Sequence, residues 1–489
     1  MNDLETAAQP EGLRRVAIDP VSRVEGHGKV TILMDEAHRV HQVRLHIVEF
    51  RGFEVFIEGR PYWEVPVMVQ RLCGICPVSH HLAAVKAMDQ IVGADALPPT
   101  VDKLRRLMHH GQILQSHALH FFHLCSPDLL LGFDSPPTQR HILGVAAQHP
   151  ELARQGVWLR KFGQEVIRHT SGKRVHGTGA IPGGMNKRLT PEERGALRAD
   201  VDQAVAWAQA AVGLFMQMHA AQPAFYDGFG EVAAHMVSLV GPDGALDLYD
   251  GRLRATHADG STVFDQVDVA RYLDVMDERT KPWTYMKFPH LRALGPQDGW
   301  YRVGPLARMG VASRLATPLA EAERQTFLAA HGGRVPHGVL NHHWARLIEL
   351  LHAAETIRDL LDDPDITGDD LRADLGPRRH EAVGVIEAPR GTLIHHYRVG
   401  DDDLVSHCNL IVSTTHNNQA MNEAIRQVAR IHLDGRAPTE ALLNHIEVAI
   451  RAYDPCLSCA THALGQMPLQ VDVVDAAGQT VHQLRSGGA

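Results

Sequence analysis

The sequence predicts a mainly α-helical fold with α+β parts, in which a bundle of long helices forms the core beside an N-terminal antiparallel sheet and small β excursions. Three observations support this class. Apolar and polar residues alternate over residues 14–50, as they do in half-buried strands. Seven later segments have apolar residues at helical spacing, several opening with proline, as helix starts often do. Asp-Gly pairs interrupt a strand-like stretch over 244–267, which indicates a hairpin.

The expected elements follow one another along the chain. The seven helices are expected at residues 77–93, 101–124, 150–170, 191–221, 340–361, 418–433 and 438–451. A loop is expected at 362–379, which is rich in Asp, Gly and Pro, and strands at 382–387 and 393–399. The helices outnumber the strands, so we expect the helical bundle to dominate the core.

Composition excludes several classes of protein. The chain has 48 Lys plus Arg against 57 Asp plus Glu, a net charge of -9, which argues against a nucleic-acid-binding face. The most apolar stretch, 204–221, is interrupted by Gln209, Gln217 and His219, so no membrane span is expected. Six cysteines in 489 residues and a polar N-terminus are not typical of a secreted disulfide scaffold. We therefore expect a cytoplasmic protein.

Two Cys-x-x-Cys pairs are the most informative motif. Cys73 and Cys76 lie in RLCGIC, and Cys456 and Cys459 in DPCLSC, near opposite ends of the chain. Two intervening residues allow both sulfurs of a pair to face one centre, so four thiolates can hold a soft or borderline metal. A structural zinc site is an alternative, although its pairs usually lie closer in sequence. A thioredoxin-like redox pair lacks its strand-to-helix context.

The surroundings of these pairs resemble the large subunit of nickel-iron hydrogenases. Each pair is followed by a histidine, in RLCGICPVSH and DPCLSCATH. Further blocks match in order along essentially the whole chain: DPVSRVEGH, FRGFE, GKRVHGTGAIPGG, YRVGPLAR and EAPRGTLIHH. The details of the cysteine blocks look most like the cytoplasmic NAD-reducing type.

This resemblance implies a nickel-iron centre with carbon monoxide and cyanide ligands on the iron, which cleaves dihydrogen heterolytically and reversibly. Cys73 and Cys456 would bind nickel terminally, and Cys76 and Cys459 would bridge to iron. The anionic cluster needs buried positive or hydrogen-bond-donating partners.

The resemblance also assigns roles around the centre. Glu25 would take the proton from Cys456, and Arg390 would lie above the open metal position, oriented by Asp454. Ser116 stands where many members have an aspartate, which alters the anionic shell of Arg390.

Other matching positions surround the ligands of the metals. His80 would donate a hydrogen bond to Cys76, and Pro389 and Thr414 match positions around the cyanides. The block of Thr414 diverges, with His416 where the family often has Trp. Two last matches imply a magnesium site: Glu54 and His462. Cys125 and Cys408, which stand alone, are expected to be buried small apolar residues.

The domain prediction follows from this resemblance. Residues 1–462 would form the catalytic unit, with an N-terminal α+β part (about 1–76), a helical core (about 77–240 and 300–462) and a β excursion (about 241–299). Residues 463–489 would be a maturation tail, removed by an endopeptidase after nickel-insertion chaperones have acted. The alternative is a permanent C-terminal strand pair.

Partners are implied because the chain has no spare cysteines for an iron–sulfur cluster and no nucleotide-binding motif. The resemblance implies two kinds of partner: diaphorase subunits, which carry FMN and bind NAD, and an iron–sulfur small subunit. Three alternatives stay open: a relative that uses NADP or deazaflavin, a zinc-stapled structural protein, and a subunit like that of the respiratory complex. The last has lost the nickel-binding cysteines, whereas this chain has all four.

Overall fold

The alternating N-terminal stretch forms the expected antiparallel sheet. Its strands are β1 (Arg14–Ile18), β2 (Gly28–Met34) and β3 (Val40–Ile47), in the order β1-β2-β3. Valine, isoleucine and leucine side chains alternate into the interior along β2 and β3, which is why these segments pair as half-buried strands. The structure is a computed structural model and describes residues 4–461, 470–474 and 480–485.

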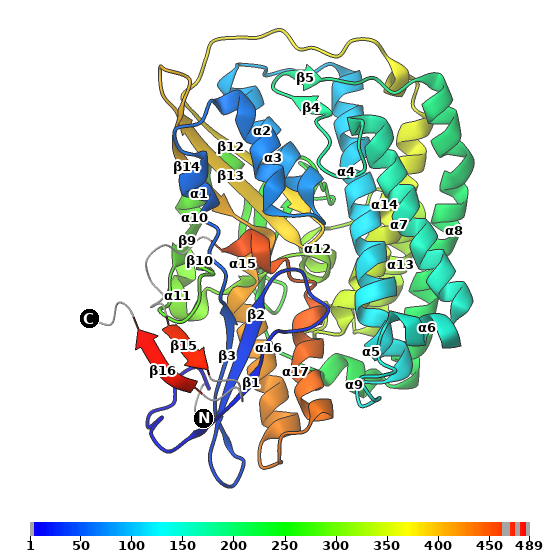
Figure 1. Ribbon diagram of the computed structural model, residues 1–489. Coiled ribbons are helices and arrows are strands. Elements are labelled where there is room, and N and C mark those ends of the chain that lie inside the picture. The colour runs from blue at the N-terminus through cyan, green and yellow to red at the C-terminus, as the bar shows by residue number, and fades with distance from the viewer. Residues whose placement is uncertain (1–3, 462–469, 475–479, 486–489) are drawn as a thin grey trace.

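Long helices pack side by side to form the bundle (Figure 1). Its main members are α4 (Pro99–Leu119), α7 (Pro150–Ser171), α8 (Pro191–Ala221) and α14 (Asn341–Asp362). α4 contacts both α7 and α14, and α14 contacts α8. The start of α8 is fixed by a capping box, in which Thr190 and Glu193 each bind the backbone N–H of the other.

The helix expected over 101–124 ends differently from the prediction. After Leu119 the backbone continues as a π-helical segment, His120–Cys125, and then as α5 (Ser126–Leu131). The helix expected over 418–433 behaves in the same way: α16 (Asn418–Val428) leads into a π-helical segment, Ala429–Leu433. α13 (Pro318–Ala330), which packs on α14, was not predicted.

A second sheet crosses the middle of the molecule and positions the site. It consists of β12 (Glu381–Ala388), β13 (Gly391–Val399) and β14 (Val405–Ile411), all antiparallel. The sequence predicts the first two strands and misses β14. α3 (Pro77–Ile91) packs on β12 at Gly384, where an added Cβ would lie 2.0 Å from the carbonyl oxygen of Ala83. Only glycine permits this approach.

The β excursion contains the expected hairpin, formed by β7 (Arg252–Thr256) and β8 (Thr262–Val267). These strands join β6 (His235–Val240) and β11 (Tyr301–Arg302) in the order β11-β6-β7-β8. The remaining strand pairs are β4 (Ala180–Ile181) with β5 (Gly184–Met185), β9 (Met276–Arg279) with β10 (Phe288–Leu291), and β15 (Gln470–Val474) with β16 (Thr480–Arg485).

Shorter helices complete the chain. They are α1 (Phe53–Ile57), α2 (Val65–Met68), α6 (Ile142–Gln148), α9 (Pro223–Gly228), α10 (Tyr272–Val275), α11 (Gly295–Asp298), α12 (Pro305–Val311), α15 (Ser413–His416) and α17 (Glu440–Ala452).

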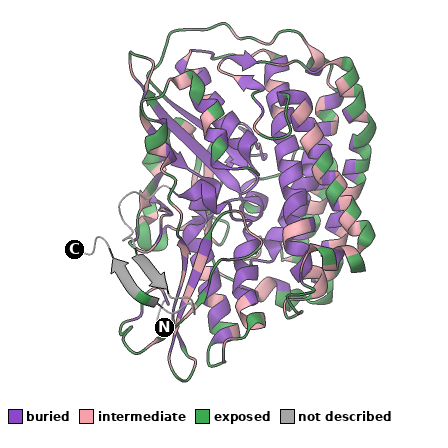
Figure 2. Ribbon diagram, in the orientation of Figure 1, coloured by how far each residue is buried: buried purple, intermediate pink, exposed green. Residues whose placement is uncertain are grey.

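Burial is greatest where the central sheet meets the bundle, along β12, β13, α4 and α14 (Figure 2). The outer face of α8 is exposed. Among the described helices, none combines the length and the apolar character needed to cross a membrane.

Candidate metal centre

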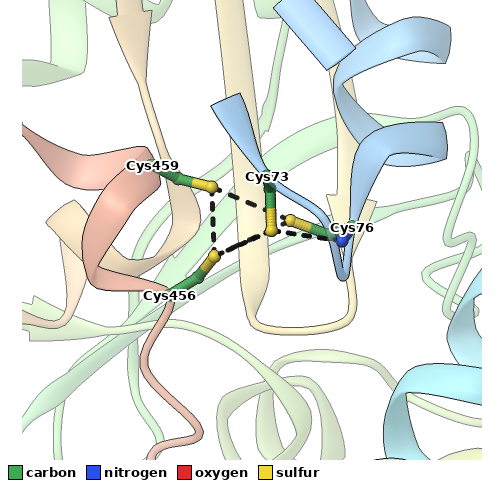
Figure 3. Close-up of side chains that lie close together, drawn as sticks. All are labelled: Cys73, Cys76, Cys456 and Cys459. Atoms are coloured by element: carbon green, nitrogen blue, oxygen red, sulfur yellow. Dashed lines mark hydrogen bonds between the residues drawn. The ribbon is translucent and has the colours of Figure 1, made fainter. Parts of the chain in front are cut away.

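Four cysteine sulfurs converge in the interior (Figure 3). The Sγ of Cys456 lies 3.1 Å from that of Cys73, 3.0 Å from that of Cys459 and 4.0 Å from that of Cys76. The sulfurs of Cys76 and Cys459 are 3.9 Å apart. All four residues are buried thiols. The two motifs, separated by nearly the whole chain, therefore meet at one centre.

The local backbone structure directs each sulfur toward this centre. Cys76 is the residue before α3, which begins with Pro77, and the backbone N–H groups of Ile75 and Cys76 donate to the Sγ of Cys73 at 3.2 and 3.3 Å. The second pair follows α17, where Asp454 turns the chain with a φ of 56°. Proline at the first helical position and a left-handed turn each fix the chain direction beside a cysteine.

The electrostatics of the cluster favour a bound cation. Burial raises the pKa of the Cys456 and Cys459 thiols well above their usual value. Burial would also raise the pKa of Cys73, but hydrogen bonds from the other three thiols lower it well below the usual value. Four buried thiolates this close together need metal charge to neutralise them. The donor set of four sulfurs fits a soft or borderline metal such as nickel or zinc.

Glu25 reaches this cluster from the loop between β1 and β2. Its Oε2 accepts hydrogen bonds from the Cys456 Sγ at 2.9 Å and from the Ser458 N–H at 3.2 Å. The backbones also pair, because the Glu25 carbonyl accepts from the Leu457 N–H at 2.9 Å. Burial, followed by the charge on Cys73, raises the pKa of Glu25. Its carboxyl group is therefore suited to receive a proton from a cysteine thiol.

Arg390 brings a buried positive charge to the centre from the turn between β12 and β13. Its Nε donates to the Asp454 carbonyl at 2.6 Å, and its second terminal nitrogen donates to Asp454 Oδ1 at 2.9 Å. The other terminal nitrogen donates to the Ser116 hydroxyl at 3.3 Å. Burial would lower the pKa of Arg390, but Asp454 and the cysteine sulfurs raise it well above its usual value. The guanidinium stays charged beside the sulfurs.

A small cavity adjoins Cys76, Cys456 and Arg390. It is lined by Cys76, Ser79, His80, Ala388, Pro389, Arg390, Leu393, Val412, Ser413, Thr414 and Cys456. The sequence-predicted residues His80, Pro389 and Thr414 therefore all face the same space. Thr414 Oγ1 also accepts from the Cys456 N–H at 2.9 Å, and His80 Nδ1 lies 3.1 Å from His395 Nε2.

The proposed magnesium ligand Glu54 lies elsewhere, at the start of α1. Its Oε1 accepts from the Leu410 N–H at 2.9 Å and lies 3.3 Å from the Nζ of Lys287. An ammonium group thus already supplies positive charge at this carboxylate. Its expected partner His462 lies outside the described residues.

Sequence reasoning missed a buried ion network behind Arg390. The Arg308 guanidinium binds both oxygens of Glu349, one carboxylate oxygen of Glu387 at 2.7 Å, and the carbonyls of Ala388 and Pro389 at 3.0 and 3.3 Å. All three ionic side chains are fully buried. Arg308 and Glu387 lie within the YRVGPLAR and EAPRG blocks, which is the signal that could have identified them.

The two isolated cysteines are buried, as expected. Cys125 is not surrounded only by apolar groups, because its Sγ lies 3.1 Å from His120 Nε2. Cys125, His120 and His343 form a buried group of three possible metal ligands.

Comparison with family models gives two matches. Residues 51–130 and 248–462 match the model described as nickel-dependent hydrogenase. Residues 15–50 match the model described as HoxL-like.

Full-length relatives agree with these matches. The NAD-reducing hydrogenase HoxS subunit beta of Cupriavidus necator is 47% identical over 96% of this chain and 99% of its own. An F420-non-reducing hydrogenase subunit (vhu) of Methanocaldococcus jannaschii is 43% identical over 85% of this chain and 99% of its own.

Solved structures share the fold. The crystal structure of an NAD+-reducing [NiFe]-hydrogenase in the H2-reduced state has a TM-score of 0.90 and 60% identity, covering 92% of this chain and 99% of that chain. The Ni-Fe-Se hydrogenase of D. vulgaris Hildenborough has a TM-score of 0.74 at 24% identity, covering 92% and 100%. The second likeness concerns the fold alone.

Proposed function

The chain belongs to the nickel-dependent hydrogenases as a large, catalytic subunit, and from this premise we propose that it reversibly splits dihydrogen into protons and electrons that reduce NAD through partner subunits. The observation that carries the proposal is the convergence of four buried cysteine sulfurs with a carboxyl group 2.9 Å from one of them. A structural metal staple needs the sulfurs but has no use for Glu25.

Cys73, Cys76, Cys456 and Cys459 would hold the nickel-iron centre through their four sulfurs. When bound, the nickel-iron centre with its carbon monoxide and cyanide ligands supplies the redox chemistry that polarises and splits dihydrogen. The cavity beside Cys76 supports this assignment, because Pro389, Arg390 and Thr414 line it together with Cys76 and Cys456.

Proton movement falls to the protein's own groups. The Cys456 sulfur would hold the proton released by the reaction and pass it to the Oε2 of Glu25, 2.9 Å away. The hydrogen bond from the Ser458 N–H keeps the carboxyl group oriented. Arg390 cannot accept this proton because its pKa is raised above its already high value. It instead balances the negative charge of the sulfurs, with Asp454 fixing its orientation.

Electron acceptance by NAD is proposed from the relatives named NAD-reducing, at 47% and 60% identity. Iron–sulfur clusters, FMN and the NAD site would lie on diaphorase subunits and on a small subunit. Six large apolar side chains within residues 48–67 are exposed, which supports a partner that covers this segment: Val48, Phe50, Val55, Phe56, Trp63 and Val67. Arg51, within this segment, donates to the Leu72 carbonyl at 2.8 Å, one residue before Cys73.

Maturation would end the chain at His462, after nickel-insertion chaperones have acted, when an endopeptidase removes 463–489. Two observations support this boundary. The match to the nickel-dependent hydrogenase model ends at residue 462, and the preceding residue, Thr461, is fully buried. Magnesium at Glu54 and His462 would have to share the Glu54 carboxylate with Lys287. The cytoplasmic location stays a prediction.

Infrared spectroscopy on the tail-free protein, purified with its partner subunits, tests the proposal. We expect bands in the carbon monoxide and cyanide stretching region, with nickel present alongside iron. Zinc alone, without such bands in a demonstrably mature preparation, would overturn the nickel-iron assignment and favour a structural site. Hydrogen-dependent reduction of NAD, compared with NADP and a deazaflavin, then tests the acceptor.

A further inference from the structure

A second group of metal-ligating side chains lies at the end of α8 that leads into α9 (Figure 1). It consists of His219 near the end of α8, Asp227 in α9 and His331, which follows α13. The Oδ1 of Asp227 lies 2.9 Å from His219 Nε2 and 3.1 Å from His331 Nε2. These residues come from elements that do not carry the four cysteines.

The hydrogen positions on His331 are constrained by its neighbours. Its Nδ1 lies 2.7 Å from the carbonyl oxygen of Phe327, which can only accept, so Nδ1 carries a hydrogen. In the neutral imidazole, Nε2 then presents a lone pair to a carboxylate oxygen that also has only lone pairs. Two such atoms at 3.1 Å repel each other unless a cation lies between them. This cation is either a proton or a metal ion.

Counting the lone pairs of Asp227 favours the metal ion. Its Oδ1 already lies 3.0 Å from the amide nitrogen of Asn341, which can only donate. With a protonated His331 and a donating His219, three N–H groups would share one oxygen that has two lone pairs. With a metal ion, Oδ1 uses one lone pair for the ion and one for Asn341, and each histidine uses the lone pair of its Nε2. A metal ion therefore satisfies every one of these atoms.

We propose that His219, Asp227 and His331 form a binding site for a divalent metal of the zinc class, with water as the fourth ligand. Two ligand atoms on a tetrahedral zinc ion lie about 3.3 Å apart, so the observed distances need to widen by only a few tenths of an ångström. The site is accessible to metal, since the side chain of Asp227 is 37% exposed while both histidines are at most 7% exposed.

The surroundings match those of a metal site in two further respects. The Phe327 carbonyl orients His331 through its second nitrogen, as carbonyls and carboxylates commonly do for metal-bound histidines. Aromatic rings enclose the ligands, with Trp344 5.1 Å from the His219 ring and Phe327 4.9 Å from the His331 ring. By contrast, the group of His120, Cys125 and His343 lies beside the cation Arg346. Burial, and next the charge of Arg346, lowers the pKa of His120. The same positive charge disfavours a bound metal ion.

A metal at this position would tie α8 and α9 to the segment between α13 and α14. It would therefore support the bundle without taking part in the reaction. The experiment uses the tag-free, nickel-loaded protein with its partner subunits, stripped with a chelator and then supplied with zinc alone. We expect one additional zinc per chain and a higher unfolding temperature. His331→Gln and Asp227→Asn should lose that zinc and the shift, and should keep the nickel content and hydrogen oxidation.

His41→Gln is the matched control, because His41 pairs with the carboxylate of Asp35 at 3.2 Å and lies in β3, which carries none of the proposed ligands. It should retain the zinc. Cobalt provides a measurement that does not depend on variants: we expect tetrahedral ligand-field bands without the sulfur charge-transfer absorption that cobalt at the four cysteines would give. Absence of zinc uptake and of these cobalt bands in the wild type would overturn the proposal and leave a proton as the bridging cation.

Discussion

Glu25 and Cys456 are 431 residues apart in sequence, yet their side chains form a 2.9 Å hydrogen bond. If this carboxyl group receives the proton from the thiol, Glu25→Gln removes the acceptor and leaves the hydrogen bonds nearly unchanged. We expect hydrogen oxidation to fall by about 10²- to 10⁴-fold, with the infrared bands and metal content retained.

Glu49→Gln serves as the control, because Glu49 is an exposed carboxylate paired only loosely with His27 at 3.3 Å. That variant should keep full activity. Wild-type rates in Glu25→Gln would show that the proton leaves Cys456 by another group.

Arg308 is the second residue whose role a single substitution can test. Its guanidinium neutralises Glu349 and Glu387, all three with no exposed side-chain surface. Arg308→Met leaves two buried carboxylates without a counter-charge, and we expect a loss of about 3–5 kcal/mol in the free energy of unfolding. Thermal or denaturant unfolding measures this loss.

Arg154→Met is the comparison, since the Arg154–Glu151 pair is exposed and exposed pairs contribute little. Similar stability of the two variants would contradict the assigned importance of the buried network. Because Arg308 also binds the Ala388 and Pro389 carbonyls, we expect Arg308→Met to disturb the position of Arg390 as well.

At the scale of elements, the contact between α3 and β12 holds the first cysteine pair against the turn that carries Arg390. Gly384→Ala places a methyl group 2.0 Å from the Ala83 carbonyl, so helix and strand must separate. We expect destabilisation of about 1–3 kcal/mol and lower retention of nickel.

Gly213→Ala tests the same change of residue where there is space. Gly213 lies within α8, with no atom within 4 Å of an added Cβ. Because alanine favours the helix over glycine by about 0.5–1 kcal/mol, this variant should be slightly more stable. Equal effects of the two substitutions would argue against a tight α3–β12 contact.

Local signals account for the elements that were predicted and for some that were missed. The helix at 191–221 was predicted to the residue, because a Thr-Pro start and a long apolar repeat both lie within the segment. α13 opens with the same Thr-Pro signal at Thr317 and was overlooked. β14 was missed because its place in the sheet depends on pairing with β13. The π-helical segments also have no reliable local signature.

The residues around the site also divide into those that motifs predicted and those that motifs missed. Motifs predicted the four cysteines, Glu25 and Arg390 as site residues, since each lies in a block of distinctive residues, and the structure brings them together. Motifs did not identify Lys287 beside Glu54, because these residues are 233 positions apart. The pairing of Arg308 with Glu349 likewise joins residues 41 positions apart on different helices. Contacts of this kind are properties of the folded chain.

At the scale of the whole molecule, buried histidines make stability depend on pH. Burial lowers the pKa of His46, His81, His109 and His117 from 6.5 to about 4. The folded chain keeps these rings neutral, whereas the unfolded chain takes up protons below pH 6.5. Stability is therefore complete above about pH 6.5 and falls as the pH drops toward 4, by about 1.4 kcal/mol per pH unit for each histidine.

Unfolding temperatures measured from about pH 7.5 down to 5 check this expectation. His81→Gln should give a shallower decline, because one fewer proton is taken up on unfolding. A profile that is flat over this range would mean that the four histidines stay neutral in the unfolded chain too, or are charged in both states, and would contradict the prediction.

The separation of the two cysteine pairs has a consequence for biosynthesis. Cys73 and Cys456 are 383 residues apart, so a nascent chain on the ribosome has only half of the sulfur donors until nearly all of it has been translated. Metal loading must then wait until Cys459 has been translated and the fold has brought the two pairs together. A chain truncated before residue 456 cannot retain the metals with four thiolates, which makes cofactor retention itself a check on completed translation.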